Sequence, residues 1–144
     1  MTTIAWDGFT LAGDRMCNDG GLPLTVCKIR KINDNLVGIS GTAGGAAEIF
    51  EWFKNGAIPS QLPACQTSKD DWCAVLEIRP DQTIWRYSLG PIPYQIYDTT
   101  NAIGSGRDFA MAAMHLGCTA KQAIEVATEL DIHTGNGIDT LTFE

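Results

Sequence analysis

The stretch MTTIAWDGFTLAGDR, residues 1–15, decides how the rest of this chain is interpreted. An ordinary chain start is polar and poorly ordered. Here Met-Thr-Thr runs directly into an apolar segment, and residues 3–6 are expected to form a strand. Asp7-Gly8 is a typical hairpin turn, and a second strand is expected at 9–12. The pattern indicates that the first residues are held in the fold.

The composition is that of an ordinary globular protein. The chain has 144 residues, of which 44% are hydrophobic and 19% charged, which fits one domain over residues 1–144 with a layered core. The formal net charge of −7 opposes contact with phosphate backbones, so no nucleic-acid partner is expected. No segment approaches the roughly 18 apolar residues of a membrane span, so no membrane partner is expected either.

The cysteines and histidines indicate neither a disulfide framework nor a metal site. Five cysteines are odd in number and scattered, and no secretory signal is visible before them. We interpret them as reduced thiols of a cytoplasmic protein. The two histidines, His115 and His133, lack the spacing of ligands, so neither a metal nor a cofactor is expected.

Hydrophobic periodicity predicts the remaining elements. Apolar and polar residues alternate over 25–32, which predicts a strand there. Together with the two strands at the start and the strand at 36–40, it is expected to form one antiparallel sheet of four strands. The expected strands after residue 12 are 25–32, 36–40, 72–78, 83–89 and 94–97, with strand character at 131–134 and 138–143; the expected helices are 42–55, 107–116 and 120–130; residues 16–24 are expected as turns and 57–70 as a loop. Helices segregated from antiparallel strands predict the α+β class, with two sheets face to face and helices outside.

Thr2 is the candidate reactive residue. Removal of Met1 would leave Thr2 with both a hydroxyl and a free α-amine. A threonine hydroxyl is a weak nucleophile, and an adjacent amine can serve as its base. The ordinary pKa of an α-amine, about 7.7–8, leaves a useful fraction neutral at cytoplasmic pH, and a nearby ammonium would lower that pKa further. If Met1 remains, this amine is absent and the protein is expected to be inactive.

Five segments resemble proteasome β-type subunits, most closely the bacterial proteasome-like (HslV-type) peptidases. They are the start with Gly13-Asp14-Arg15, the strand at 28–32, the glycine-rich 41–48, the Gly-Ser-Gly within 102–106, and 131–135. Each is weak alone, but the five occur in the family's order. The resemblance implies an N-terminal nucleophile hydrolase fold, a four-layer αββα sandwich. One helix layer is expected to be reduced, because residues 57–71 are proline-containing and polar where the family usually has a second long helix.

The resemblance implies a role for each matched residue. Thr2 would be the nucleophile, with its own amine as proton shuttle. Asp14 and Lys28 would form a buried ion pair beside Thr2, and Lys28 would lower the pKa of the amine. The backbone N–H of Gly44 would donate to the oxyanion. Read singly, Lys28 is equally a solvated lysine on a polar strand face, and Gly44 a glycine that permits close helix packing.

Three further residues would surround the amine with hydrogen bonds. The resemblance assigns this role to Ser105, Asp131 and Thr134. Thr134 stands where the family usually has serine, and it keeps the hydroxyl. Read singly, Asp131 is equally a turn residue at the end of a helix.

The function implied is that of a threonine-type endopeptidase subunit, which cleaves peptide bonds through an acyl-enzyme on Thr2. Such subunits form homo-oligomeric rings that enclose their sites and take peptides or unfolded proteins as substrates. The resemblance also implies an ATP-driven unfoldase as partner, but the reduced helix layer argues against it, because that side faces the regulatory ring in the family. Two alternatives stay open: a catalytically silent scaffold or binding protein of the same fold, and an amidase for small substrates.

Overall fold

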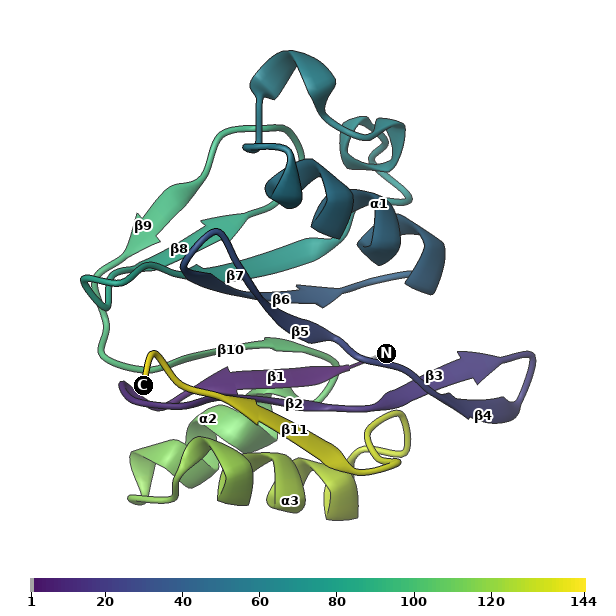
Figure 1. Ribbon diagram of the computed structural model, residues 1–144. Coiled ribbons are helices and arrows are strands. Elements are labelled where there is room, and N and C mark those ends of the chain that lie inside the picture. Colours follow the sequence, from purple (N-terminus) through teal and green to yellow (C-terminus); the bar gives the residue numbers. More distant parts are fainter. Residues whose placement is uncertain (1) are drawn as a thin grey trace.

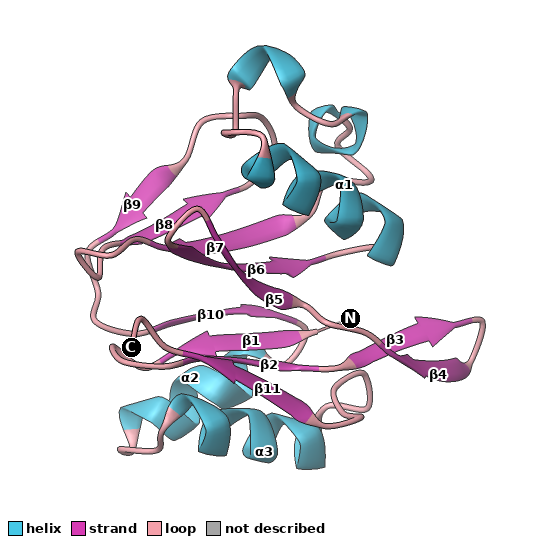
Figure 2. Ribbon diagram, viewed as in Figure 1, coloured by secondary structure: helices cyan, strands magenta, loops and turns pink. Residues whose placement is uncertain are grey.

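The computed structural model describes residues 2–144 as four stacked layers (Figure 1). Two β-sheets face each other, and helices cover both outer faces (Figure 2). Helix α1 (Ala43–Lys54) covers one sheet, while α2 (Arg107–His115) and α3 (Ala120–Leu130) cover the other. The expected α+β class and αββα sandwich are confirmed. The expected removal of Met1 lies outside the described residues.

The sheet beneath α2 and α3 contains the start of the chain. Its antiparallel order is β10-β1-β2-β11. The strands are β1 (Thr3–Trp6), β2 (Leu11–Asp14), β10 (Asn101–Gly104) and β11 (Ile138–Leu141). In this register Thr3 lies opposite Gly104, and Ile4 lies opposite Gly13. The pairing of β1 with β10 therefore brings the segment that follows residue 104 to the beginning of the chain.

The sheet beneath α1 is built in chain order, β5-β6-β7-β8-β9. The strands are β5 (Ile29–Ile32), β6 (Asn35–Ser40), β7 (Ala74–Ile78), β8 (Ile84–Tyr87) and β9 (Tyr94–Ile96). The ladder between β5 and β6 continues one residue beyond the strand, because Ile39 N donates to Lys28 O at 3.1 Å. Lys28 is thus held at the end of an edge strand.

Three hydrophobic clusters fill the three spaces between the layers. Alternation along the strands divides the residues: Ile4 and Trp6 face the other sheet, whereas Ala5 faces the helices. The space between the sheets holds large side chains, among them Leu36, Leu76, Ile78, Ile84 and Ile103. The α2–α3 side is filled mainly by alanines, and the α1 side mainly by aromatic and branched residues. Both sheets are therefore buried on both faces, which fixes the register of β1.

The α1 layer holds one α-helix within residues 2–144, so the expected reduction of this layer is confirmed. The segment after it forms two short 3₁₀ helices, η1 (Pro59–Gln61) and η2 (Ala64–Thr67), in place of the expected loop. The buried Gln66 side chain ties this segment to the sheet. Its Nε2 donates to Cys73 O at 3.1 Å and Ser88 O at 3.0 Å, and its Oε1 accepts from Cys73 N. Across residues 2–144, no helix has the length and apolarity needed to cross a membrane.

Several sequence expectations were wrong in detail. The supposed turns at 16–24 are a hairpin of β3 (Met16–Asp19) and β4 (Leu22–Thr25), which projects from the body (Figure 1). Its polar, glycine-containing tip resembles a loop in sequence, and its β4 residues are all exposed. The first strands do not share one sheet either. Strands β1 and β2 lie in one sheet and β5 and β6 in the other, because the hairpin carries the chain across between them.

Three other segments also differ from the sequence prediction. The second strand is at 11–14 rather than 9–12. Strand β10 was not expected, because its four residues directly precede the turn into α2. Residues 131–134 are a turn and not a strand: Asp131 N donates to Ala127 O, and Thr134 N donates to Asp131 O. Tertiary pairing and local turn bonds decided these segments.

Leu76 tests the packing between the sheets. It is fully buried, so Leu76→Ala is expected to lower the free energy of unfolding by about 2–5 kcal/mol through lost burial and a cavity. Leu116→Ala is the matched control, because Leu116 is 84% exposed and its change should stay within about 0.5 kcal/mol. Chemical denaturation followed by circular dichroism measures both; equal losses would contradict the two-sheet core.

Candidate active site

The backbone nitrogen of Thr2 lies at the head of a chain of hydrogen bonds. Thr2 is 2% exposed, and its N donates to Ser105 Oγ at 3.2 Å. Gly106 N donates in turn to Thr2 O at 3.3 Å. The first described residue is therefore fixed on both sides of its α-carbon, as the sequence of residues 1–15 indicated.

The two glycines around Ser105 make this contact possible. Gly104 has φ +99°, and a side chain there would overlap the carbonyl of Thr2. A side chain on Gly106 would overlap Thr3 Oγ1. The Gly-Ser-Gly sequence is thus required by close backbone approach, which brings the Ser105 hydroxyl to Thr2 N.

Asp131 organises the polar groups behind Ser105. Its Oδ2 accepts from Ser105 Oγ at 2.6 Å and from Thr134 Oγ1 at 2.7 Å, and its Oδ1 accepts from His133 N at 3.1 Å. Thr3 Oγ1 lies 2.7 Å from Thr134 Oγ1. Burial acts to raise the pKa of Asp131, but the hydrogen bonds from Ser105, Thr134 and His133 outweigh it, so the pKa lies below its ordinary value. The carboxylate therefore stays ionised at neutral pH and orients the Ser105 hydroxyl.

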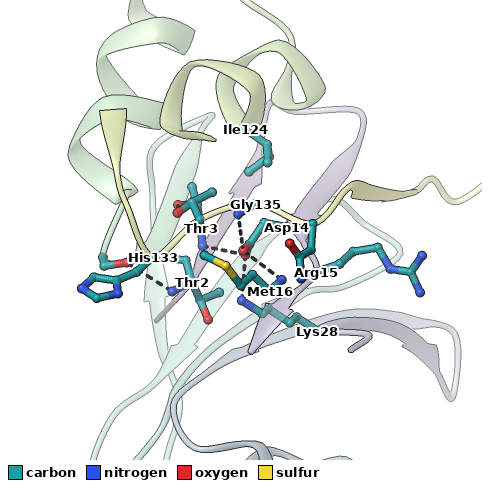
Figure 3. Close-up of polar contacts among 12 residues, drawn as sticks. Thr2, Thr3, Asp14, Arg15, Met16, Lys28, Ile124, His133 and Gly135 are labelled. Carbon is teal, nitrogen blue, oxygen red and sulfur yellow. Dashed lines mark hydrogen bonds and ion pairs between the residues drawn. The ribbon is translucent and has the colours of Figure 1, made fainter. Parts of the chain in front are cut away.

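Asp14 occupies the other side of the chain start. It is fully buried, and its Oδ1 accepts from Lys28 Nζ at 2.9 Å and from Thr3 N at 3.0 Å. Its Oδ2 accepts from Gly135 N at 3.1 Å and from Met16 N at 3.3 Å. Figure 3 shows these groups converging on one carboxylate. Both oxygens are satisfied, as a buried charge requires.

Lys28 is buried beside Thr2, with 7% of its surface exposed. Burial lowers the pKa of Lys28 below its ordinary value, and the charge and hydrogen bond of Asp14 oppose that shift. The expected ion pair between Asp14 and Lys28 is present. Lys28 is therefore not a solvated surface lysine.

Thr2 and Lys28 both line a groove of about 960 Å³. One wall is the β3–β4 hairpin and the edge of the second sheet, and another is the N-terminal half of α1. Residues Asp70, Asp71 and Trp72, which lie between η2 and β7, contribute a further side. Thr2 and Lys28 therefore border the same groove.

Gly44 lies apart from this arrangement. It is exposed in the first turn of α1, a side chain there would meet open space, and it is not among the residues that line the groove. Its role as an oxyanion donor stays a prediction. Gly41 does line the groove, and a side chain there would overlap Cys73 Sγ. Gly41 was not among the residues expected at the site, although its place directly after a strand and before a helix start was an available signal.

The fold brings six of the seven residues expected at the site to one place. Thr2, Asp14, Lys28, Ser105, Asp131 and Thr134 are joined through the contacts described above, although they come from both ends and the middle of the chain. Within residues 2–144, no group of three or more His, Cys, Asp or Glu side chains is arranged to hold a metal ion.

The comparisons with known proteins bear on the fold. No family model matches the sequence, and no curated protein matches it. Solved structures do: BPH from Thiobacillus denitrificans in complex with epoxomicin has a TM-score of 0.73 at 17% identity, over 99% of this chain and 98% of that chain. Eukaryotic HslV from Trypanosoma brucei has a TM-score of 0.71 at 23% identity, over 97% of each chain.

This chain has the fold of HslV and BPH. A second BPH structure from Thiobacillus denitrificans agrees, with a TM-score of 0.70 at 16% identity over 99% of this chain and 98% of that chain. The proteasome-like fold expected from the five sequence segments is confirmed. At sequence identities of 16–23%, this structural similarity establishes the fold and not the chemistry of the site.

Asp131 gives the site a measurable pH dependence. Because its folded pKa lies below the unfolded value of 3.8, its ionised form stabilises the fold above that pH, and this contribution disappears as the pH falls through the folded value. We expect Asp131→Asn to be less stable than the wild type at neutral pH, and the difference to shrink on acidification from about pH 5 to about pH 2.

Denaturant unfolding at a series of pH values measures this difference. The matched control is Asp98→Asn, since Asp98 is exposed and outside the site, and its effect should stay within about 0.5 kcal/mol at every pH. A difference for Asp131→Asn that grows on acidification would contradict the assigned role.

Proposed function

We propose that this protein is a threonine-type peptidase, an N-terminal nucleophile hydrolase whose nucleophile is Thr2 after removal of Met1. One observation carries the proposal. The nitrogen of Thr2 is held by Ser105 at the head of an ionised Asp131 network, directly beside the buried Asp14–Lys28 pair and at a groove large enough for a peptide. A first residue with no chemical task needs none of these contacts.

The reaction follows from the groups at the site. The free α-amine takes the proton of the Thr2 hydroxyl as Thr2 Oγ attacks the substrate carbonyl carbon. A backbone N–H, from Gly44 as expected or from Gly41 in the groove, stabilises the oxyanion. The protonated amine then gives its proton to the leaving amine, which departs as the peptide bond breaks and leaves an ester on Thr2. Water, deprotonated by the same amine, attacks the ester carbonyl; the amine then returns the proton to Thr2 Oγ as the ester bond breaks, which releases the acid and restores the free hydroxyl and amine.

Lys28 supports this cycle electrostatically. Its ammonium lies next to Thr2, so it favours the neutral form of the α-amine, which is the form able to act as base. Asp14 keeps Lys28 in place and supplies the counter-charge that makes a buried ammonium tolerable. Ser105 and Asp131 orient the amine toward the hydroxyl.

We extend the proposal to the assembly and the cell. The protein acts in the cytoplasm on peptides or unfolded proteins, as a homo-oligomeric ring that encloses its sites. The fold that the chain shares with HslV and BPH supports the ring assembly, as does the exposed hairpin edge of β3 and β4. The single α-helix of the α1 layer within residues 2–144 argues against docking of an ATP-driven unfoldase, so the proposal does not include that partner.

Variants at residue 2 test the nucleophile. The wild type and Thr2→Ser are expected to lose Met1, to react with a peptide epoxyketone at residue 2, and to cleave peptides. Thr2→Ala should also lose Met1, but it should neither react nor cleave, because it has no hydroxyl. Intact mass and peptide mapping measure processing and labelling, and a fluorogenic peptide assay measures turnover.

The residue-2 experiment also separates the alternatives. Labelling of Thr2→Ala at the same site would contradict the nucleophile. A processed wild type that neither reacts nor cleaves would favour a silent scaffold. A wild type that hydrolyses small amides but no peptide would favour an amidase.

Lys28→Met tests the electrostatic role of the ammonium. We expect kcat to fall by at least about 100-fold, and the acidic limb of the remaining activity to move to higher pH, because the α-amine regains a higher pKa. Lys31→Met is the control, since Lys31 is exposed and lies outside the groove. The folded fraction of each variant is measured first by circular dichroism. An unchanged pH profile for a folded Lys28→Met would argue against this role.

A further inference from the structure

A second cation follows Lys28 along the groove wall. Arg30 is two residues further along the edge strand, and alternate residues of a strand share a face about 6.6 Å apart. Both side chains line the groove that contains Thr2. The wall next to the proposed nucleophile thus carries two positive charges, in a protein whose formal net charge is −7.

Arg30 is exposed and contacts an aromatic ring rather than an acidic group. It is exposed, and its guanidinium lies 4.4 Å from the centre of the Phe50 ring of α1. Stacking on an aromatic face leaves the N–H groups at the edge of the guanidinium available. None of the ion pairs within residues 2–144 involves Arg30, whereas Lys28 is paired with Asp14.

The surroundings of Arg30 define what this edge can recognise. The helix side of the groove consists of Ala43, Ala46, Ala47 and Phe50, which offer no charge. The acidic groups that line the groove are Asp19 at the end of β3 and Asp70 and Asp71 before β7, and none of the three forms an ion pair with Arg30. The planar fork of an arginine matches the two oxygens of a carboxylate.

From this geometry we infer that Arg30 selects substrates with an acidic side chain next to the cleaved bond. The inference rests on the proposed function, since it takes Thr2 as the point of cleavage. Because Thr2 and Arg30 line the same groove, a peptide held at Thr2 can present a carboxylate side chain to Arg30. Because the guanidinium is already oriented by stacking on Phe50, the Arg30 side chain loses little conformational entropy when it binds a carboxylate.

Peptide cleavage tests the preference. Peptides that carry Glu, Gln or Leu at the two positions flanking the cleaved bond are digested and the products identified by mass spectrometry. We expect kcat/KM for the Glu peptide to exceed that for its Gln counterpart by at least about tenfold at low salt, and the ratio to fall as ionic strength rises. In Arg30→Gln this ratio should fall to about one, and Arg30→Lys should lie between, because it keeps the charge without the fork.

Lys31→Gln is the matched control. It removes an equal charge from the next residue of the strand, on the opposite face and outside the groove, so the Glu-to-Gln ratio should stay at the wild-type value. A ratio near one in the wild type, or a ratio that survives Arg30→Gln, would overturn the inference. Equal losses for the Glu, Gln and Leu peptides in Arg30→Gln would overturn it as well, because they would mark a structural role against Phe50.

A binding measurement separates this inference from the proposed function. Fluorescently labelled Glu and Gln peptides with amidated C-termini are titrated with Thr2→Ala, and with Thr2→Ala combined with Arg30→Gln, while anisotropy is recorded. Tighter binding of the Glu peptide that is lost with Arg30→Gln supports the role of Arg30 even if the wild type proves inactive. Cleavage by the wild type with no acidic preference in either assay sinks the Arg30 inference and leaves the proposed function intact.

Discussion

The site depends on one buried carboxylate, that of Asp14. It holds the ammonium of Lys28, the amide of Thr3 and the amide of Gly135, and so joins the beginning of the chain to the second sheet and to the segment before β11. Removing one partner from a buried ion pair typically costs about 3–5 kcal/mol, because the remaining charge is left without compensation. The same contact therefore makes the fold sensitive to loss of either partner and places a cation beside Thr2. Such a contact fixes geometry more than it adds net stability, since desolvation of both charges offsets much of their attraction.

The position of β1 explains how a chain start can be this well ordered. It lies inside a sheet, between β10 and β2, and both of its faces are buried. Small residues permit the close approach. Gly38 and Gly13 leave room for Ile4 and Ile29 between the sheets, and Gly104 leaves room for the carbonyl of Thr2. A shift of β1 by one residue would exchange Ile4 for Ala5 in the core between the sheets, so packing alone holds Thr2 to within one position.

The reduced helix layer has a consequence for the groove. The segment after α1 is tied to the sheet by the buried Gln66, and its end supplies Asp70, Asp71 and Trp72 to the groove. This segment therefore forms part of the lining around the proposed reactive centre. The groove lining contains the two carboxylates of this segment as well as the cations Lys28 and Arg30.

The sequence by itself determined the class of fold, the helices and most strands. Local patterns sufficed for these, because periodicity reports which face of an element is buried. Apart from Thr2, the candidate site residues, among them Asp14 and Lys28, were named only through the resemblance of five segments to the proteasome β-type family. Only the tertiary structure decided that β1 and β2 lie in a different sheet from β5 and β6, that β10 exists, and that residues 16–24 form a hairpin. It also decided that Lys28 is buried and that Gly41, and not Gly44, lines the groove. These outcomes depend on contacts between residues distant in sequence, such as Asp14 with Gly135 and Thr2 with Ser105. A local pattern of side chains does not specify which distant residue a segment will contact.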